Sequence, residues 1–233
     1  MSTAEKLDRL IPDQLKAELP SAVIGGEIIV LEQVGSTNDA ILQIVSRHPS
    51  RAEGFVVFAE HQTAGRGQRG NRWESTAGKG LWFSILSRPE IQLRDSGRLT
   101  IWAIETISDV VRTEFDLEPV IKLPNDVQLC GRKVAGVLVE MRAQERAPHL
   151  AVVGIGINVN QSRDDFPVEL QDKAISLAMA LGRQVDRQKF AVAILRNLDL
   201  TYRETFSGGI AAVKSSPAAT TTRDKRMARF RKA

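Results

Sequence analysis

Two apolar runs and the long polar connection between them constrain this sequence most. The runs GFVVFAE (54–60) and GLWFSILS (80–87) are rich in β-branched and aromatic residues, which predicts two strands. The connection of roughly eighteen residues is too long for a hairpin turn, and connections of that length without secondary structure are usually functional or disordered. We therefore expect a sheet protein in which this connection covers a site.

The centre of the connection, Gly65–Ser75, reads GRGQRGNRWES. Glycine lets backbone amides approach a ligand, arginine forks onto phosphate or carboxylate, and Trp73 offers a flat face for stacking. The run lacks the Gly-Lys-Ser/Thr ending of a Walker motif and the strand-to-helix opening of a dinucleotide fingerprint. It indicates an anion-handling loop, and on spacing alone a solvated surface loop stays open as the alternative.

The composition is that of an ordinary globular protein. The 233 residues are 42% hydrophobic and 26% charged, which fits one large domain or one domain with an appendage. Cys130 is the single cysteine, so the chain can form no internal disulfide and has no CxxC-type metal cluster. The sequence shows neither a signal peptide nor an apolar run of about 20 residues. We expect a soluble cytoplasmic protein.

The basic character of the chain belongs to its C-terminal end. The pI is about 9.4 and the net charge is +4. Seven basic residues and one acidic residue follow Ser207, so this tail carries +6 and the remainder carries −2. We expect a disordered tail and a body that is not a nucleic-acid-binding surface.

Periodicity predicts the other elements. Further strands are expected at 28–34, 120–122, 127–129, 133–140 and 149–160, and helices at 5–19, after Ser36, at 98–115, and around 175–181 and 190–206. Ser36 is the expected N-cap of its helix. The run Ser36, Thr37 and Asn38 can serve capping alone, or it can place a helix N-terminus against an anionic ligand.

Several polar and glycine positions on the later strands admit two readings. Pro124 holds Asn125 and Asp126 on a turn. Lys133 opens a strand, where a lone lysine ordinarily faces solvent. Gly136 within that strand indicates close approach of another group. Gly154 and Gly156 alternate with isoleucines, which fits either a flat ligand lying on the sheet or close packing of a helix.

Four segments taken together resemble the catalytic domain of biotin protein ligases. They are GSTN (35–38), QTAGRGQRGNRW (62–73), KLPNDV with GRKVAGVLVE (122–140), and GIGINVN (154–160), in that order and spacing. The resemblance implies an α/β (α+β) domain, a mixed sheet flanked by helices of the biotin and lipoate ligase type, which is class II synthetase-like. It also implies that ATP and biotin give biotinyl-5′-AMP, and that biotin then passes to a lysine of a biotin carboxyl carrier protein.

The resemblance also assigns roles by motif. By this resemblance, the residues expected to bind biotin are Ser36, Thr37, Asn38, Gln62, Gly65, Arg66, Gly67, Gln68, Lys133, Gly136, Gly154 and Gly156. ATP or adenylate binding falls to Arg66, Arg69, Arg72, Trp73, Asn125, Asp126, Lys133 and Asn158. Catalysis falls to Lys133, Arg66 and Asp126, with Asp126 as the candidate ligand of Mg²⁺. A positive site of this kind offsets repulsion between a carboxylate and a triphosphate, and it needs no nucleophilic side chain.

The expected organisation is a helical lead-in at 1–26, a catalytic domain at 27–206 and a basic tail at 207–233. We expect neither the DNA-binding domain nor the small C-terminal β domain found in the family. The implied partner is the carrier domain of acetyl-CoA carboxylase or a similar carboxylase, with no membrane partner, and homodimerisation is left open. A lipoate or octanoate ligase or transferase, a biotin sensor without catalysis, and a basic-tailed nucleic-acid binder are the alternatives.

Overall fold

A seven-stranded mixed sheet forms the centre of the computed structural model, which describes residues 8–20, 22–144 and 148–206. The strands are β1 (Ile28–Val34), β2 (Val56–Gln62), β3 (Gly80–Ser87), β4 (Val120–Lys122), β5 (Asp126–Leu129), β6 (Arg132–Arg142) and β7 (Leu150–Asn158). Their order in the described part of the chain is β1-β2-β3-β7-β6-β5-β4. The pair β1 and β2 is parallel, and the other neighbours are antiparallel.

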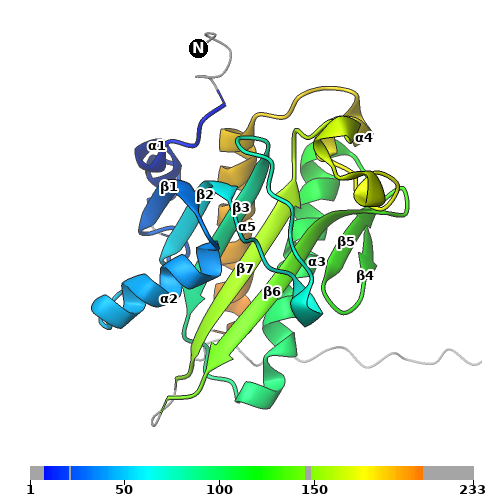
Figure 1. The fold of residues 1–233 in the computed structure, drawn as a ribbon. Coiled ribbons are helices and arrows are strands. Elements are labelled where there is room, and N and C mark those ends of the chain that lie inside the picture. Colours follow the sequence, from blue (N-terminus) through cyan, green and yellow to red (C-terminus); the bar gives the residue numbers. More distant parts are fainter. Residues whose placement is uncertain (1–7, 21, 145–147, 207–233) are drawn as a thin grey trace, which may run out of the picture.

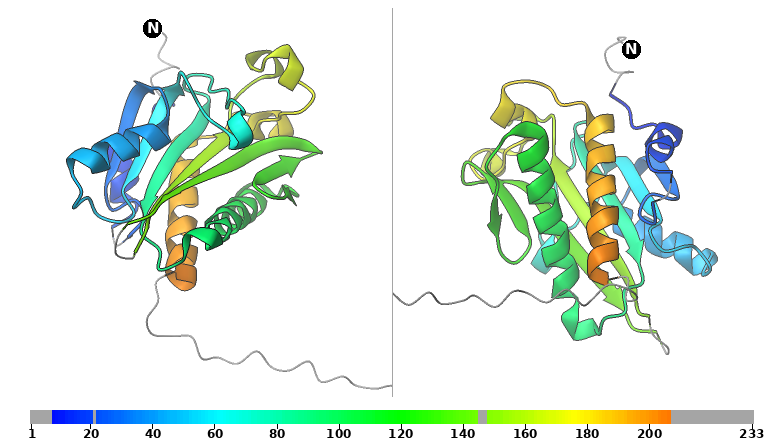
Figure 2. Two further views of the ribbon diagram at one scale, coloured as in Figure 1. Left: turned by 60° about the horizontal axis from the view of Figure 1, so that its bottom comes forward. Right: turned by 180° about the vertical axis from the view of Figure 1, so that it is seen from behind.

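Helices cover both faces of this sheet (Figure 1). They are α1 (Pro12–Ala17), α2 (Thr37–Arg47), α3 (Gly97–Phe115), α4 (Leu177–Leu181) and α5 (Arg187–Phe206), with 3-10 turns at Gln68–Gly70, Leu93–Asp95, Arg163–Asp165 and Val168–Leu170. The long helices α3 and α5 lie side by side behind the sheet, whereas α2 lies in front (Figure 2). This is the expected arrangement of a mixed sheet flanked by helices.

The larger hydrophobic core lies between the sheet and the pair α3 and α5. Period-two alternation places Val153, Ile155 and Ile157 of β7 in this core, together with Phe83 of β3. Trp102 of α3 is 5% exposed and belongs to the same core, as its helical spacing predicted. Gly154 and Gly156 alternate with these residues, so they fall on the other face of β7.

The N-terminal segment packs onto the domain, but its helix is shorter than expected. A helix was predicted from Glu5, yet within the described residues it begins only at Pro12. Proline has no backbone N–H and fits best at the first helical position, which explains this start. Leu10, Leu15 and Leu19 enter the larger core. The division of the chain at residue 26 stays a prediction.

A buried ionic group fixes the same segment. Arg187, 1% exposed at the start of α5, donates to the Gly80 carbonyl at 3.0 Å, to Glu60 Oε2 at 2.8 Å and to the Asp8 carbonyl. The second oxygen of Glu60 accepts from the Leu10 amide at 2.9 Å. Arg187 thus joins the N-terminal segment to the end of β2 and the beginning of β3. These two strand ends are the points where the glycine-arginine connection leaves and re-enters the sheet.

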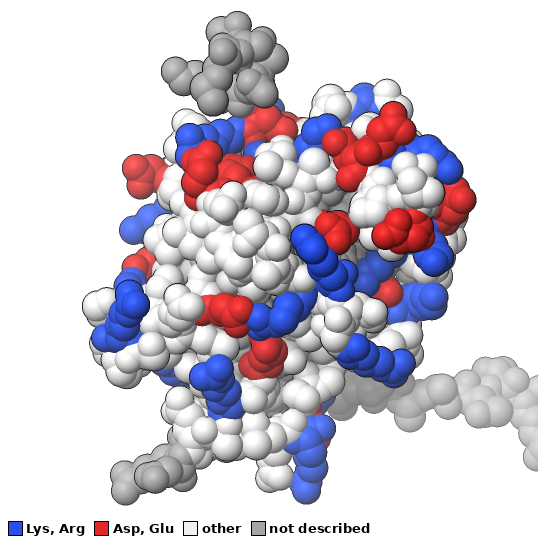
Figure 3. All heavy atoms as spheres, in the orientation of Figure 1, with Lys and Arg blue, Asp and Glu red and all other residues white. Residues whose placement is uncertain are grey.

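Two strands and the end of α4 lie where the sequence predicted them. The strands at 28–34 and 80–87 have the predicted bounds, and α4 ends at Gly182 in the left-handed region (φ 67°), as expected of a helix stop. The tail at 207–233 lies outside the described residues. Figure 3 shows acidic and basic side chains interspersed over the front face rather than gathered into one basic area.

None of the helices in the described residues has both the length and the apolar character needed to cross a membrane.

Candidate functional site

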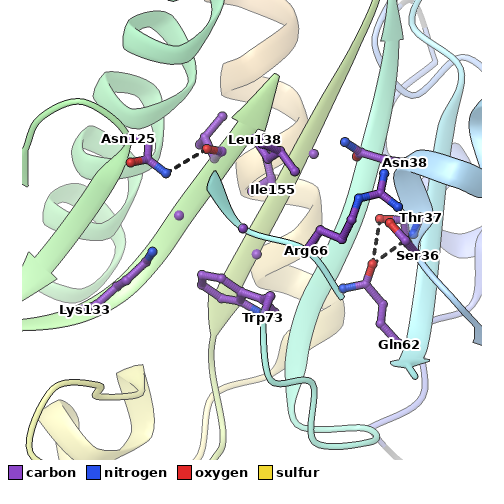
Figure 4. A pocket seen from close by; sticks show the side chains of 15 residues that line it. Ser36, Thr37, Asn38, Gln62, Arg66, Trp73, Asn125, Lys133, Leu138 and Ile155 are labelled. Atoms are coloured by element: carbon purple, nitrogen blue, oxygen red, sulfur yellow. Dashed lines mark hydrogen bonds between the residues drawn. The ribbon is translucent and has the colours of Figure 1, made fainter. Parts of the chain in front are cut away.

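A pocket lies on the front face of the sheet, between the start of α2, the glycine-arginine loop and strands β6 and β7 (Figure 4). It is lined by Ser36, Thr37, Asn38, Gln62, Arg66, Gly67, Trp73, Asn125, Lys133, Gly136, Val137, Leu138, Gly154, Ile155 and Gly156. The space that these side chains leave free is about 40 Å³. A volume of that size accommodates about one water molecule or a few.

The start of α2 forms a polar wall of the pocket. Ser36 is the N-cap residue, as expected, with extended backbone angles, but its side chain makes no capping hydrogen bond. Gln62 at the end of β2 replaces it. Its Oε1 accepts from the Thr37 amide at 2.9 Å and lies 3.2 Å from the Thr37 hydroxyl. This contact satisfies a helix amide and fixes the Gln62 side chain with its nitrogen turned away from Thr37.

The first half of the loop is a narrow hairpin. Gly67 donates to the Asn71 carbonyl at 2.7 Å, and Trp73 donates to the Gly65 carbonyl at 2.9 Å. A Cβ on Gly65 would lie 2.5 Å from the Trp73 carbonyl oxygen, so this close approach requires glycine. The hairpin carries Arg66 and Trp73 into the pocket.

The second half of the loop is tied to the body by an ion pair. Lys79 Nζ lies 2.6 Å from Asp165 Oδ2, and the Thr76 hydroxyl donates to the Asp165 carbonyl at 3.3 Å. Burial raises the pKa of the Asp165 carboxyl, but the hydrogen bonds from Lys79 and Ser162 outweigh it, so that this pKa lies below its usual value.

Trp73 covers the glycine face of the sheet. A Cβ on Gly156 would lie 2.5 Å from the indole ring, and one on Gly136 would lie 2.9 Å from it. The alternating glycines were expected to accept either a flat ligand or a helix. In this structure they accept the indole of the chain's own loop, while a Cβ on Gly154 would lie 2.3 Å from Asn38 Oδ1.

Two cations lie on opposite sides of Trp73 (Figure 4). Lys133 Nζ is 5.1 Å from the centre of the Trp73 ring and 2.6 Å from Asp126 Oδ1. Arg66 pairs with Asp39, and its NH2 lies 3.1 Å from Glu140 Oε2. The hydrogen bond to Asp39 raises the pKa of the Arg66 guanidinium, which therefore stays charged. Lys133 lines the pocket, and its side chain is 32% exposed.

A protein-family model matches the part of the chain that contains the pocket. Residues 30–158, more than half of the chain, match the model of the biotin/lipoate A/B protein ligase family. The chain belongs to this family. The matched range runs from β1 through β7 and includes every residue that lines the pocket.

Two named members of the biotin/lipoate ligase family are similar to this chain over most of its length. The bifunctional ligase/repressor BirA of Bacillus spizizenii is 34% identical over 210 residues, which cover 90% of this chain and 64% of that protein. The chain thus spans less than two thirds of that relative's length. The biotin–[acetyl-CoA-carboxylase] ligase of Mycobacterium tuberculosis is 34% identical over 203 residues, covering 82% of this chain and 72% of that protein.

A solved family structure shares the fold. The biotin protein ligase from Aquifex aeolicus in complex with biotin and ATP superposes with a TM-score of 0.66 at 28% sequence identity. The match covers 78% of this chain and 73% of that one. The predicted α/β fold of the biotin/lipoate ligase type is therefore confirmed.

The pocket gathers most, but not all, of the site residues that family resemblance predicted. The predicted residues outside its lining are Gly65, Gln68, Arg69, Arg72, Asp126 and Asn158. Asp126 reaches the site through Lys133. Arg72 instead pairs with Glu74 at 3.1 Å, and the buried Asn158 amide donates to the carbonyls of Lys133 and Ile175. The ligand-binding roles of all these residues stay predictions.

Sequence reasoning missed several residues around the pocket. Val137, Leu138 and Ile155 line it, and their signal was their place beside the glycines of β6 and β7. Asp39 and Glu140 hold Arg66, and Ser84 contacts Thr37 and Asn38. Asn125 lines the pocket as predicted, with its amide donating to the Val137 carbonyl at 3.0 Å.

Proposed function

We propose that this chain is an ATP-dependent biotin protein ligase. It activates biotin to biotinyl-5′-AMP and transfers the biotinyl group to a lysine of a biotin carboxyl carrier protein. The observation that carries this proposal is that one pocket combines three features. These are the polar wall at the start of α2, a glycine floor made of Gly136, Gly154 and Gly156, and the two cations Arg66 and Lys133 on opposite sides of Trp73. The names of the similar proteins from M. tuberculosis and A. aeolicus support it.

The polar wall suits the cyclic urea of biotin. Thr37, Asn38 and Gln62 offer hydroxyl and amide groups from buried, hydrogen-bonded positions. A urea has two N–H donors and one carbonyl acceptor, so it requires several fixed partners, whereas a linear acyl chain requires none. This wall favours biotin over lipoate or octanoate, the second candidate in the same family.

The two cations suit the adenylation step. A biotin carboxylate oxygen attacks the α-phosphorus of ATP, a new P–O bond forms, and pyrophosphate leaves with the electrons of the broken bond. Arg66 and Lys133 offset the repulsion between the carboxylate and the triphosphate and stabilise charge on the α-phosphate. In the second step the carrier lysine amine attacks the acyl carbon and AMP leaves, so no protein nucleophile is needed.

The glycine-arginine loop suits a covering role. Trp73 already lies on Gly136 and Gly156, and its indole N–H has no hydrogen-bond partner among the described residues. A buried unpaired N–H costs about 1–3 kcal/mol, which favours a rearrangement that gives it a partner. We assign Trp73 to adenine packing and the loop to excluding water from the adenylate.

Asp126 can contribute to a magnesium site only if the phosphates of ATP supply the other ligands. No group of three or more His, Cys, Asp or Glu side chains in the described residues could hold a metal. Mg²⁺ is commonly bound by one or two carboxylates together with nucleotide phosphates, and Asp126 offers one carboxylate beside Lys133. Such an ion would neutralise triphosphate charge.

The proposed acceptor is the carrier domain of acetyl-CoA carboxylase or a similar carboxylase. Relatives from M. tuberculosis and Paracoccus denitrificans are named as ligases for that enzyme. A cytoplasmic location fits such a substrate and the exposed free thiol of Cys130. Homodimerisation stays a prediction.

Biotin transfer to a purified apo carrier domain tests the proposal. With biotin and ATP, mass spectrometry should find one biotinyl group on one lysine of the carrier, and omission of ATP should abolish it. A carrier that stays unmodified while the ligase binds biotin would favour the sensor alternative. Modification by octanoate or lipoate in preference to biotin would favour the second candidate.

A further inference from the structure

A bulge in β6 turns Lys133 toward the pocket. The pairing of β5 with β6 steps from Val127 opposite Ala135 to Gln128 opposite Lys133, so Val134 is an extra residue in β6. Side chains alternate between the two faces of a regular strand, and one inserted residue reverses that alternation. Val134 and Ala135 accordingly both belong to the larger core, although they are consecutive. Without the bulge Lys133 would share the core face with Ala135, whereas with it Lys133 lines the pocket (Figure 4).

The backbone of Lys133 is held by the segment that precedes α4. The pairing of β6 with β7 begins only at Ala135, so β7 supplies no regular partner for Lys133. The Lys133 amide instead donates to the Lys173 carbonyl at 2.8 Å, and the Lys133 carbonyl accepts from the Ile175 amide at 3.0 Å. These two hydrogen bonds form a short parallel bridge beside the bulge.

Asn158, the last residue of β7, closes this arrangement. Its Nδ2 donates to the Lys133 carbonyl at 3.3 Å and to the Ile175 carbonyl at 3.2 Å, and its Oδ1 accepts from Gln161 Nε2 at 3.3 Å. Asn158 is 4% exposed and is not among the residues that line the pocket. Both hydrogens of its amide are therefore used inside the protein, on backbone carbonyls at the two sides of the bridge.

We propose that Asn158 is a positioning residue that holds the bulge of β6 and thereby aims the Lys133 ammonium into the pocket. The proposal rests on the proposed function, in which Lys133 stabilises charge on the α-phosphate, and it replaces the adenine contact that family resemblance predicts for Asn158. A contact with the adenine amino group would have to use the second lone pair of Asn158 Oδ1. The two roles make different kinetic predictions.

Asn158→Ala removes the contacts to the bulge, and Asn160→Ala is its matched control. Asn160 is 6% exposed, and its amide also donates twice and accepts once, with Val185 and Asp8 as partners. It makes no hydrogen bond to Lys133 among the described contacts. Both variants lose a buried amide near the end of β7, so a merely structural role would affect both alike.

Biotin-dependent ATP–pyrophosphate exchange measures the consequence for Lys133. Asn158→Ala should lower kcat about 10- to 100-fold at a KM for ATP within about threefold of the wild type, because a displacement of about 1 Å at a catalytic group weakens the transition state rather than nucleotide binding. Asn160→Ala should keep the wild-type kcat per folded molecule. An unchanged kcat in Asn158→Ala, or equal losses of kcat in both variants, would overturn the proposal.

Inosine triphosphate separates positioning from base recognition, because inosine has a carbonyl where adenosine has the amino group. If Asn158 only positions Lys133, the ratio of kcat/KM for ATP to that for inosine triphosphate should be the same in Asn158→Ala and in the wild type. A ratio that falls toward one in the variant would show that Asn158 reads the adenine amino group, which contradicts the proposal.

A double variant tests whether Asn158 acts through Lys133. Once the ammonium is removed, its position no longer matters, so Lys133→Ala with Asn158→Ala should exchange at the rate of Lys133→Ala alone. Losses that multiply in the double variant would show that Asn158 acts on the reaction by another route.

Hydrogen exchange at the Lys133 and Ile175 amides provides a readout that needs no substrate. Both amides donate across the bridge, so they should lose protection in Asn158→Ala and keep it in Asn160→Ala. Unchanged protection in Asn158→Ala would overturn the proposal and leave the proposed function standing. A wild type without biotin-dependent exchange would instead overturn the proposed function, and with it the part that Asn158 plays in adenylation.

Discussion

The two faces of the central sheet are built from the same strands but serve different ends. On β7, Val153 and Ile157 belong to the larger core that contains α3 and α5, whereas Gly154 and Gly156 line the pocket. Burial of apolar side chains gives folding its main driving force, at about 25 cal/mol per Å². The glycines contribute none of this and instead leave room for Asn38 and Trp73.

Strand β3 also has one face in the core and one face toward the pocket, but its residue on the pocket side is a serine rather than a glycine. Phe83 and Ile85 enter the core behind the sheet, and between them the fully buried Ser84 faces Thr37 and Asn38. A buried hydroxyl is tolerated only when it is hydrogen-bonded. The rear face therefore stabilises the fold, and the front face fixes the polar groups of the site. Substitutions on the two faces should separate stability from activity.

The largest effect is expected for Lys133→Ala on the front face. Removing one preorganised donor to developing charge costs a factor of about 100 to 1,000 in rate. Biotin-dependent ATP–pyrophosphate exchange should fall by that factor at an unchanged melting temperature. Lys173→Ala is the matched control, since this neighbouring lysine is exposed and lies outside the pocket lining. Near-normal exchange by Lys133→Ala would remove that residue from the catalytic group.

Gly156→Ala should produce the next largest effect. Its Cβ would lie 2.5 Å from the Trp73 indole, so the ring and the loop must shift. A displacement of about 1 Å near reacting groups can lower the rate by about 100-fold. Gly97→Ala serves as control, because its Cβ would meet no neighbouring atom within 4 Å. Equal exchange rates for the two variants would show that Trp73 needs no glycine floor.

Ile85→Val on the rear face should affect stability alone. Loss of one buried methylene group at this site, which is 0% exposed, should lower the free energy of unfolding by about 0.5–1.5 kcal/mol. The exchange rate per folded molecule should stay that of the wild type. Denaturant unfolding and exchange kinetics on one preparation test this, and a selective loss of kcat would contradict the separation of the two faces.

The smallest effect concerns the anchor at the end of the loop. The Lys79 and Ser162 hydrogen bonds hold the pKa of Asp165 below its usual value against the effect of burial. The ionised Asp165 therefore stabilises the fold above its unfolded-state pKa of about 3.8, and this contribution is lost as pH falls through the lower folded-state pKa.

Lys79→Met should weaken this anchor. The midpoint of acid unfolding should move to higher pH, and the stability at pH 7 should fall by no more than about 1 kcal/mol, because the pair is partly exposed. Circular dichroism across an acid titration provides the measurement. Identical acid midpoints for variant and wild type would show that the pair contributes nothing.

Local patterns predicted the strands and the long helices, and the family resemblance predicted most of the residues that line the pocket. Periodicity placed Ile28–Val34 and Gly80–Ser87 correctly, and motif spacing brought Lys133 and Thr37 to one site. The differences between prediction and structure lie at the starts of two helices. Pro12 starts the first helix late, and Gln62 takes the place that the Ser36 side chain was expected to fill.

Contacts between distant segments could not be predicted from one sequence. Glu140 and Asn38 are 102 residues apart, and Arg187 and Glu60 are 127 apart. No periodicity or turn signal links such positions, because their contact depends on strand order and on the packing of α5. The cover of Trp73 over the glycine floor was missed for the same reason, since the loop's own path decides which flat group lies there.

Labelled ATP–pyrophosphate exchange by the wild-type chain tests the central claim most directly, because it reports the adenylation step without a carrier protein. The account predicts rapid exchange with biotin, and exchange near background with octanoate or with no acid, since only biotin brings a urea to the polar wall. Background exchange with biotin, or equal exchange with octanoate, would contradict the claim that this pocket activates biotin.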